Sequence, residues 1–364
     1  FEVTLNDDAT GEVSVLINNK TYKNRLYDGK TLISVPDLDV CNYTYIALYD
    51  GDTKYNATLI NGNISVFIIN VKLNASDLVK YYGSQEKLTA QLLDKSDNPL
   101  SGQKIIFTVN NNDYERITDN LGFASMNINL NSGNYTAGVK FAGNNVYDSI
   151  KTTVLIEIKP TVMAKDLSKI FRNATQYYAT FVDSQGNILK NTNVSFNING
   201  VFYNRTTNES GAARLNINLN PGEYILTAKN PSTGEFITTI VTVLPSIVEA
   251  NNLTKYYKNE SQYTLKILDD YGNPVCEGVA VKLSINGVFY ERKTNSSGYI
   301  NMNINLNSGT YIITAEYNDL RVSNTIEVLP ILEAKNLSMK YKDGSKFEVK
   351  LLDGEGNPFA GQII

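Results

Sequence analysis

The sequence predicts an all-β chain, a tandem array of antiparallel two-sheet sandwich domains arranged end to end, and three observations support this. The segment Asn-Ile-Asn-Leu-Asn-x-Gly-x-Tyr occurs three times, ending at Tyr135, Tyr224 and Tyr311, which are 89 and 87 positions apart. Stretches of alternating apolar and polar residues are separated by turn sequences roughly every 8 to 12 residues. No stretch has a convincing helical pattern. A repeat of this length corresponds to one small domain.

Other landmarks keep the same period and divide the chain into domains. An Asp-x-x-(Gly/Asp)-Asn turn ends at Asn98, Asn187, Asn273 and Asn357. A Thr-(Asp/Asn)-x-x-Gly turn begins at Thr118, Thr207 and Thr294, and a proline marks each seam at Pro160, Pro245 and Pro330. We therefore expect domains at residues 1–73 (N-terminally incomplete), 74–159, 160–245, 246–330 and 331–364 (the start of a further domain). Because both ends fall inside repeats, the chain is expected to be a segment of a longer protein.

The third module shows the strands most clearly. About seven short strands are expected, at residues 163–170, 176–182, 193–198, 201–207, 212–220, 224–229 and 235–244. Asn199-Gly200 fits a two-residue hairpin turn, because both residues accept positive φ. The corresponding turns are Asn286-Gly287, Asn110 to Asn112, and Asn18-Asn19. Strict alternation gives each strand one buried and one solvated face, which is typical of a two-sheet antiparallel sandwich.

A tyrosine two residues after glycine, at the start of a late strand, matches the tyrosine corner of Ig-like sandwiches. In that corner the ring packs in the core and the hydroxyl binds backbone a few residues upstream. We expect this structural role for Tyr43, Tyr135, Tyr224 and Tyr311, although Cys41 replaces the glycine in the first module. The prediction is thus an array of Ig-like domains.

The repeats resemble the Ig-like domains of archaeal adhesin-like surface proteins from methanogens. In the first module the resemblance lies in residues 5–11, 19–22, 35–38 and 42–44, and in later modules in Gly-Asn-Pro and Ile-Asn-Gly-Val-x-Tyr. It spans the whole chain and implies an extracellular protein at the cell surface or cell wall, attached through regions outside this segment and active in adhesion. It implies no catalytic residue.

Composition argues against several other functions. The net charge is −4 with no run of Lys or Arg, so nucleic acid is not an expected partner. No stretch approaches the ~20 apolar residues of a membrane span. The chain has no His, the commonest general base and metal ligand. We expect no enzymatic activity and no cofactor. The two cysteines, Cys41 and Cys276, lie in different modules, so an intradomain disulfide is not expected.

Fourteen Asn-x-Ser/Thr sequons occur, about twice as many as the composition predicts by chance, and they indicate a secreted N-glycosylated surface. An AT-rich genome that favours Asn codons is the alternative explanation. The candidate glycosylation sites are Asn19, Asn42, Asn56, Asn63, Asn74, Asn134, Asn173, Asn193, Asn204, Asn208, Asn252, Asn259, Asn295 and Asn336.

Three further motifs have a chemical and a structural interpretation. The recurring Lys80, Lys169 and Lys255 could form isopeptide cross-links, but the only asparagine on an expected last strand is Asn324. The Asp-rich turns could bind Ca²⁺, although their spacing is too sparse for an EF-hand and fits ordinary turn capping. The pairs Tyr81-Tyr82, Tyr177-Tyr178 and Tyr256-Tyr257 should each place one ring inward and one outward, and strand propensity explains them without sugar binding.

The expected function is a non-enzymatic adhesin stalk whose partners are neighbouring repeats of the same protein. Short apolar seams containing proline indicate a semi-rigid rod. With about 33 Å per ten-residue strand, four modules should reach on the order of 130–160 Å. Two alternatives stay open. The modules could bind host or microbial surface glycans or proteins through sandwich loops, or the chain could be a subunit of an extracellular filament assembled by strand exchange.

Overall fold

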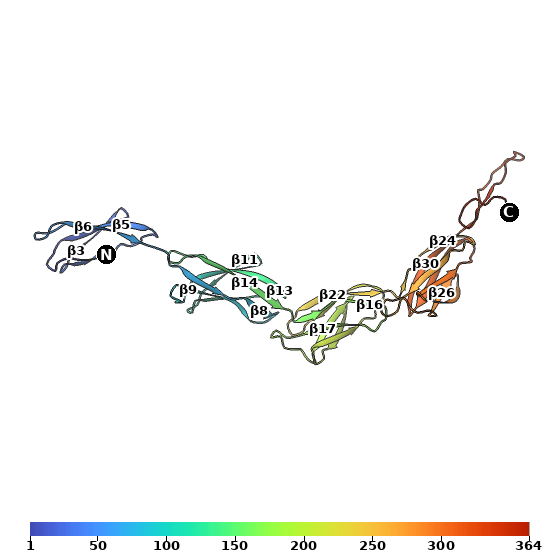
Figure 1. Ribbon diagram of the computed structural model, residues 1–364, viewed down its shortest axis with the longest axis horizontal. Coiled ribbons are helices and arrows are strands. Elements are labelled where there is room, and N and C mark those ends of the chain that lie inside the picture. Colours follow the sequence, from blue (N-terminus) through green and yellow to red (C-terminus); the bar gives the residue numbers. More distant parts are fainter. Residues whose placement is uncertain (364) are drawn as a thin grey trace. The chain divides into compact units, whose positions relative to one another are not determined.

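The computed structural model describes residues 1–363, and every regular element in that range is a β-strand (Figure 1). The end of the expected fifth domain, residue 364, lies outside the described residues. The chain forms two compact units, residues 1–80 with 84–159 and residues 81–83 with 160–364, which are described separately. The predicted all-β fold class is confirmed.

In the first unit, the first module has one four-stranded and one two-stranded sheet, with the strand orders β3-β2-β5-β6 and β1-β4. All pairs are antiparallel. Alternate residues of β2, including Val13, Val15 and Ile17, are buried in the core. The strands are β1 Glu2–Thr4, β2 Glu12–Ile17, β3 Lys20–Arg25, β4 Lys30–Leu32, β5 Asn42–Tyr49 and β6 Thr58–Ser65.

The second module has a three-stranded sheet, β12-β9-β7, and a five-stranded sheet, β11-β10-β13-β14-β8. Its strands are β7 Val71–Ala75, β8 Leu78–Tyr81, β9 Lys87–Asp94, β10 Lys104–Val109, β11 Asn112–Ile117, β12 Phe123–Asn127, β13 Gly133–Phe141 and β14 Ile150–Lys159. The expected boundary before residue 74 is wrong in detail. It falls inside β7, whose Val71 already pairs with Asp94 of the second module.

In the second unit, the third and fourth modules repeat this design with the sheets β15-β17-β20 and β16-β22-β21-β18-β19, then β23-β25-β28 and β24-β30-β29-β26-β27. The third module contains β15 Val162–Ala164, β16 Leu167–Ile170, β17 Gln176–Phe181, β18 Asn193–Ile198, β19 Val201–Thr206, β20 Ala212–Asn216, β21 Gly222–Lys229 and β22 Phe236–Leu244. The fourth contains β23 Ile247–Val248, β24 Leu253–Tyr256, β25 Gln262–Ile267, β26 Ala280–Ile285, β27 Val288–Lys293, β28 Tyr299–Asn303, β29 Gly309–Tyr317 and β30 Leu320–Leu329. Beyond them, β31 Leu332–Ala334 pairs with β32 Val349–Leu351.

In the second, third and fourth modules the first strand differs from its expected form. The strand predicted over residues 163–170 is divided into β15, which pairs antiparallel with β17, and β16, which pairs parallel with β22. The first strand therefore crosses from one sheet to the other, and the second, third and fourth modules each contain eight strand segments. The same crossing occurs between β23 and β24.

The hairpin turns were predicted correctly. Asn199 and Gly200 have φ of 52° and 75°, and Asn286 and Gly287 have φ of 50° and 74°. The first and second modules use two asparagines in place of Asn-Gly, at Asn18-Asn19 and at Asn110-Asn111, and all four have positive φ. This conformation gives the twist that a two-residue hairpin requires.

The core lies between the two sheets of each module. In the third module, Tyr177 and Phe181 of the smaller sheet and Phe196 and Val241 of the larger sheet are almost completely buried in the same cluster. The rings of Tyr177 and Phe196 meet edge to face, with centroids 5.9 Å apart. These contacts make the module a sandwich and not two separate sheets.

Candidate functional site

The side chains that recur at matching positions hold backbone atoms, beginning with the four tyrosines of the expected corners. Each hydroxyl donates a hydrogen bond to the carbonyl oxygen four residues upstream. These bonds are Tyr43 to Asp39 (2.9 Å), Tyr135 to Asn131 (2.9 Å), Tyr224 to Asn220 (2.7 Å) and Tyr311 to Asn307 (2.9 Å). The first module makes this bond with Cys41 in place of glycine.

A buried lysine follows the crossing of the first strand in three modules. Lys80, Lys169 and Lys255 are only 4–5% exposed. Lys169 Nζ donates to the carbonyl oxygens of Asn173 (2.8 Å), Thr175 (3.0 Å) and Ile217 (3.0 Å). Burial lowers the pKa of all three lysines, because desolvation disfavours the ammonium form. Each ammonium group therefore links the turn that follows it to the end of a strand far away in the sequence.

These lysines also explain why one strand is shorter than expected. The strand predicted over residues 212–220 ends as β20 at Asn216. The carbonyl oxygen of the next residue, Ile217, accepts its hydrogen bond from Lys169 Nζ. Lys80 with Ile128 and Lys255 with Ile304 repeat this contact, both at 3.1 Å.

The polar turns found in the sequence also bind their own backbone. Asp183 Oδ1 accepts hydrogen bonds from the backbone N–H groups of Gln185 and Asn187, and its Oδ2 accepts one from Asn187 Nδ2. These bonds hold the pKa of the Asp183 carboxyl below its ordinary value, with the Asn187 side chain as the largest cause. Thr207 Oγ1 donates to the carbonyl oxygen of Leu189 at 2.6 Å. Among residues 1–363, no group of three or more His, Cys, Asp or Glu residues is arranged to hold a metal ion.

The lysine and asparagine considered for a cross-link have separate partners. Lys255 Nζ donates to the carbonyl oxygens of Ser261 and Ile304, both at 3.1 Å. Asn324 instead accepts a hydrogen bond from the Tyr263 hydroxyl at 2.7 Å and donates to the carbonyl oxygen of Ala250 at 3.0 Å. The role of Asn324 is to satisfy a buried tyrosine, which sequence reasoning missed.

Another position missed from the sequence lies three residues before each buried lysine. Asp77, Asp166 and Asn252 stand where the first strand crosses between the sheets. Their Oδ1 atoms accept hydrogen bonds from last-strand N–H groups, at 2.8 Å from Leu155, 2.8 Å from Ile240 and 2.9 Å from Thr325. The recurrence of Asp or Asn three residues before each of these lysines is the sequence pattern from which this position could have been predicted.

Twelve of the fourteen sequon asparagines are exposed, whereas Asn173 and Asn259 are half-buried. These two occupy the same place, four residues after the buried lysine of their modules. Asn173 Nδ2 donates to the carbonyl oxygen of Asp270 at 3.0 Å, and Asn259 Nδ2 donates to that of Gly354 at 2.7 Å. Each acceptor lies in the Asp-rich turn of the next module, so these asparagines join successive modules within the second unit.

The tyrosine pairs follow the inward–outward expectation in only one case. On β17, Tyr177 is buried and Tyr178 is 54% exposed. In the other two pairs both rings are half-buried, because β8 ends at Tyr81 and β24 at Tyr256. The most prominent exposed rings at matching strand positions are instead Phe202, at 73%, and Phe289, at 83%.

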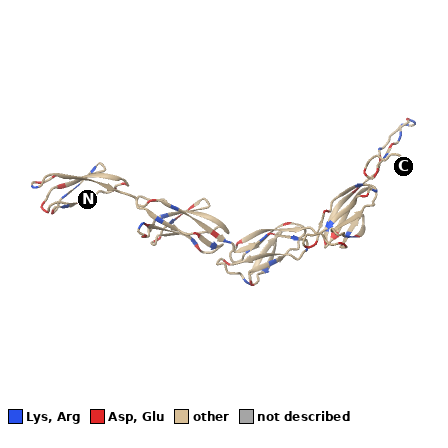
Figure 2. Cartoon of the chain, in the orientation of Figure 1, with Lys and Arg blue, Asp and Glu red and all other residues tan. Residues whose placement is uncertain are grey.

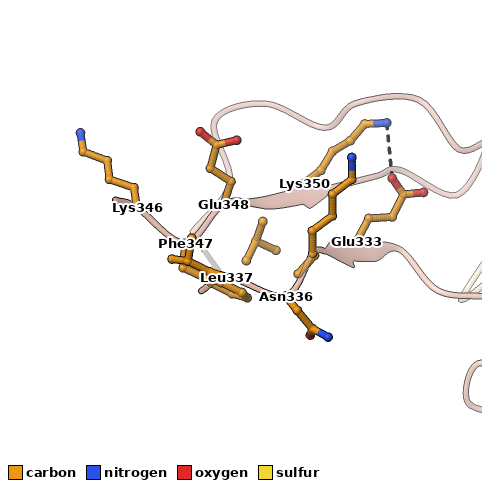
Figure 3. Close-up of a pocket in the computed structure, with 10 residues that line it drawn as sticks. Glu333, Asn336, Leu337, Lys346, Phe347, Glu348 and Lys350 are labelled. Atoms are coloured by element: carbon orange, nitrogen blue, oxygen red, sulfur yellow. Dashed lines mark ion pairs between the residues drawn. The ribbon is translucent and has the colours of Figure 1, made fainter. Parts of the chain in front are cut away.

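A groove with a volume of about 930 Å³ lies on the two-stranded segment after the fourth module. Figure 3 shows Leu337 and Phe347 beside one another in it, and the ion pair between Lys350 and Glu333 at its edge, with a distance of 3.6 Å. The groove is open, since 62% of the Phe347 surface is exposed. Nothing in its lining indicates a particular ligand.

Charged residues of both signs are interspersed along the modules (Figure 2). Both cysteines are free and exposed. Residues 1–363 contain no helix long and apolar enough to cross a membrane.

No protein-family model matches the chain. Similar solved structures include a 1.5-MDa bacterial ice-binding adhesin, with 13% identity over 65% of this chain and 86% of that chain and a TM-score of 0.26. The I9–I11 tandem of titin shows 13% identity, coverage of 71% and 99%, and a TM-score of 0.28. Invasin, a bacterial integrin-binding protein, shows 15% identity, coverage of 92% and 76%, and a TM-score of 0.26. At these values the similarities assign no function, and the fold assignment rests on the strand pairing described above.

Proposed function

We propose that this chain is a non-enzymatic spacer segment of an extracellular adhesin, in which successive Ig-like modules give reach and limited flexibility. The observation that carries the proposal is the repetition of one internal design. The corner tyrosine, the buried lysine and the Asp-rich turn recur at matching positions and bind backbone atoms. The features that the modules share are therefore the ones that build a module, as expected for a spacer made of repeated domains.

Small-angle X-ray scattering of the purified 364-residue chain tests the spacer role. A rod of 130–160 Å has a radius of gyration of about 40 Å, given about 33 Å for each ten-residue strand. A compact globule of the same length would have a radius of gyration of about 21 Å. The larger value is expected, and a value near that of the globule would contradict the proposal.

Cell-surface location needs a separate test. Antibodies raised against this segment should label intact source cells, and protease added outside the cells should remove the label. Labelling that appears only after the cells are opened would rule out an extracellular adhesin.

One observation favours a second candidate, a module that binds surface glycans or proteins. Phe202 on β19 and Phe289 on β27 are strongly exposed on the outer strands of their five-stranded sheets. Aromatic rings of this kind can stack on sugars or anchor a protein partner. The purified chain should then bind host cells, microbes or isolated cell wall saturably, and F202S/F289S should weaken the binding. If the folded chain does not bind, only the spacer function is supported.

A further inference from the structure

The strongest unexplained feature is the pair of joint asparagines, Asn173 and Asn259, which differ from the other twelve sequon asparagines in burial and in hydrogen bonding. Their Nδ2 atoms donate to the next module, at 3.0 Å and 2.7 Å. Their Oδ1 atoms accept hydrogen bonds from their own turns, from Thr175 N at 3.2 Å and Ser261 N at 2.8 Å. With both ends of the amide engaged, its orientation is fixed.

At both joints the acceptor turn packs against the preceding module, in ordinary contact at the first joint and too closely for any added side-chain atom at the second. A Cβ on Gly272 would lie 3.7 Å from Ile170 Cδ1, and one on Gly356 would collide with the ring of Tyr256. Both glycines also have positive φ, 84° and 85°, so other residues are disfavoured there. At the first joint, Arg172 beside Asn173 forms an ion pair of 2.8 Å with Asp319 of the fourth module.

N-glycosylation uses the same nitrogen atom. A bond forms between Nδ2 and the anomeric carbon of the first sugar, Nδ2 loses a proton, and the phosphate of the activated sugar donor leaves. The sugar replaces one of the two hydrogens on Nδ2. If it replaces the hydrogen directed at the acceptor turn, the hydrogen bond to that turn is lost. If it replaces the other hydrogen, it must fit beside a half-buried nitrogen whose acceptor carbonyl lies only 2.7–3.0 Å away.

We infer that Asn173 and Asn259 are the joints that fix successive modules, and that a closed joint and a glycan on the same asparagine exclude each other. The sequons therefore form two classes, twelve available for modification and two used for module docking. The inference deepens the spacer proposal. Its test is nevertheless independent, because a compact radius of gyration would remove the spacer without changing the local order at a joint.

Electron–electron double resonance tests the first joint in the full chain without glycans. Spin labels are placed on Cys276 and on a cysteine introduced by S210C, with C41S removing the other thiol. T175A is the matched control, because it destroys the sequon and keeps the Asn173 amide. The parent and T175A should give the same narrow distance distribution. N173A should broaden it, with the ratio of docked to undocked modules falling about fivefold for one lost hydrogen bond. An unchanged distribution in N173A would overturn the joint.

Glycopeptide mapping tests the exclusion in chain produced by a host that attaches N-glycans. The exposed Asn193 and Asn204 should carry glycan, and Asn173 and Asn259 should not. Equal occupancy of a joint asparagine and Asn193 would refute the exclusion. In the same host, joint variants that leave Asn173 unable to dock, with G272V as the example, should raise occupancy at Asn173. The glycan should remain absent from Asn259, whose joint is intact.

Discussion

At the scale of single residues, the position eight places after each buried lysine shows how a polar group is tolerated in the core. Tyr177 and Tyr263 occupy it in the third and fourth modules and are 1% exposed. Their hydroxyls need partners because an unpaired buried hydroxyl is costly. Thr239 Oγ1 lies 2.8 Å from the first hydroxyl and Asn324 Oδ1 lies 2.7 Å from the second. In the second module the matching position is Leu88, an apolar residue that needs no hydrogen-bond partner.

The buried tyrosine makes the fourth module sensitive to alkali. Burial raises the pKa of Tyr263 from 10.0 to about 12. The protonated Tyr263 hydroxyl contributes its full stabilisation of the fourth module below pH 10, where the unfolded chain also holds the proton. This stabilisation is lost as the pH rises from 10 to 12. The loss should be about 2–3 kcal/mol. Calorimetry should show Y263F with a smaller alkaline loss but about 1 kcal/mol less stable at pH 7. Y271F, at a tyrosine that is 89% exposed, is the control, and an equal effect in both variants would contradict the prediction.

Replacing a buried lysine should loosen the turn that it fastens. K169M fills similar space but leaves three backbone carbonyl oxygens without their donor, and we expect a cost of about 2 kcal/mol. That cost is limited because the variant no longer buries a charge. Hydrogen exchange measured by mass spectrometry should show faster exchange near Asn173 and Ile217. K165M, at an exposed lysine of the same module, should change nothing. Unaltered exchange in K169M would show that the ammonium group is dispensable.

At the scale of elements, the first strand of the second, third and fourth modules pairs in both sheets of its module. It passes from one sheet to the other at Asp77, Asp166 or Asn252. The side chain at this position accepts a hydrogen bond from a backbone N–H group of the last strand. The crossing breaks the regular ladder locally, so that N–H group needs another acceptor. Alternation alone predicts one continuous strand because it records which face is buried and not which neighbour is paired.

At the crossing position, the side chain should need an oxygen atom that accepts the hydrogen bond, but it should not need a negative charge. D166A removes the acceptor of the Ile240 N–H group, which lies 2.8 Å away, and should cost the third module about 1–2 kcal/mol. D166N should be tolerated, since Asn252 fills the same role in the fourth module. Denaturation of the two variants checks this. A loss in D166N as large as in D166A would mean that the negative charge is needed.

At the scale of the whole molecule, repetition places the same backbone-binding turns in successive modules. The carboxylates of Asp94, Asp183 and Asp353 all accept hydrogen bonds from their own turns, which lower the pKa of each. Their oxygen atoms are therefore already engaged in turn capping, in accordance with the usual role of Asp in turns.

Because these carboxylates are engaged, added Ca²⁺ should not raise the melting temperature of the chain, and a chelator should not lower it. Thermal melts in Ca²⁺, in Mg²⁺ and in chelator provide the measurement, with Mg²⁺ controlling for general ionic effects. A rise specific to Ca²⁺ that D183N and its counterpart D94N reduce would show that the turns bind calcium.

The sequence by itself determined the repeat, the all-β class, the hairpin turns and the positions that bear the corner tyrosines. These features depend on local chemistry, since alternation fixes the buried face and Asn-Gly fixes φ at the turn. Tertiary structure alone decided the crossing of the first strand, the end of β20, the hydrogen bond from Lys169 to Ile217 and the hydrogen bond from Tyr263 to Asn324. Each depends on an atom 48 or more residues away. Pairing across such separations is set by which backbone groups remain unsatisfied after the sheets assemble, and that is why sequons of identical pattern differ at Asn173 and Asn259.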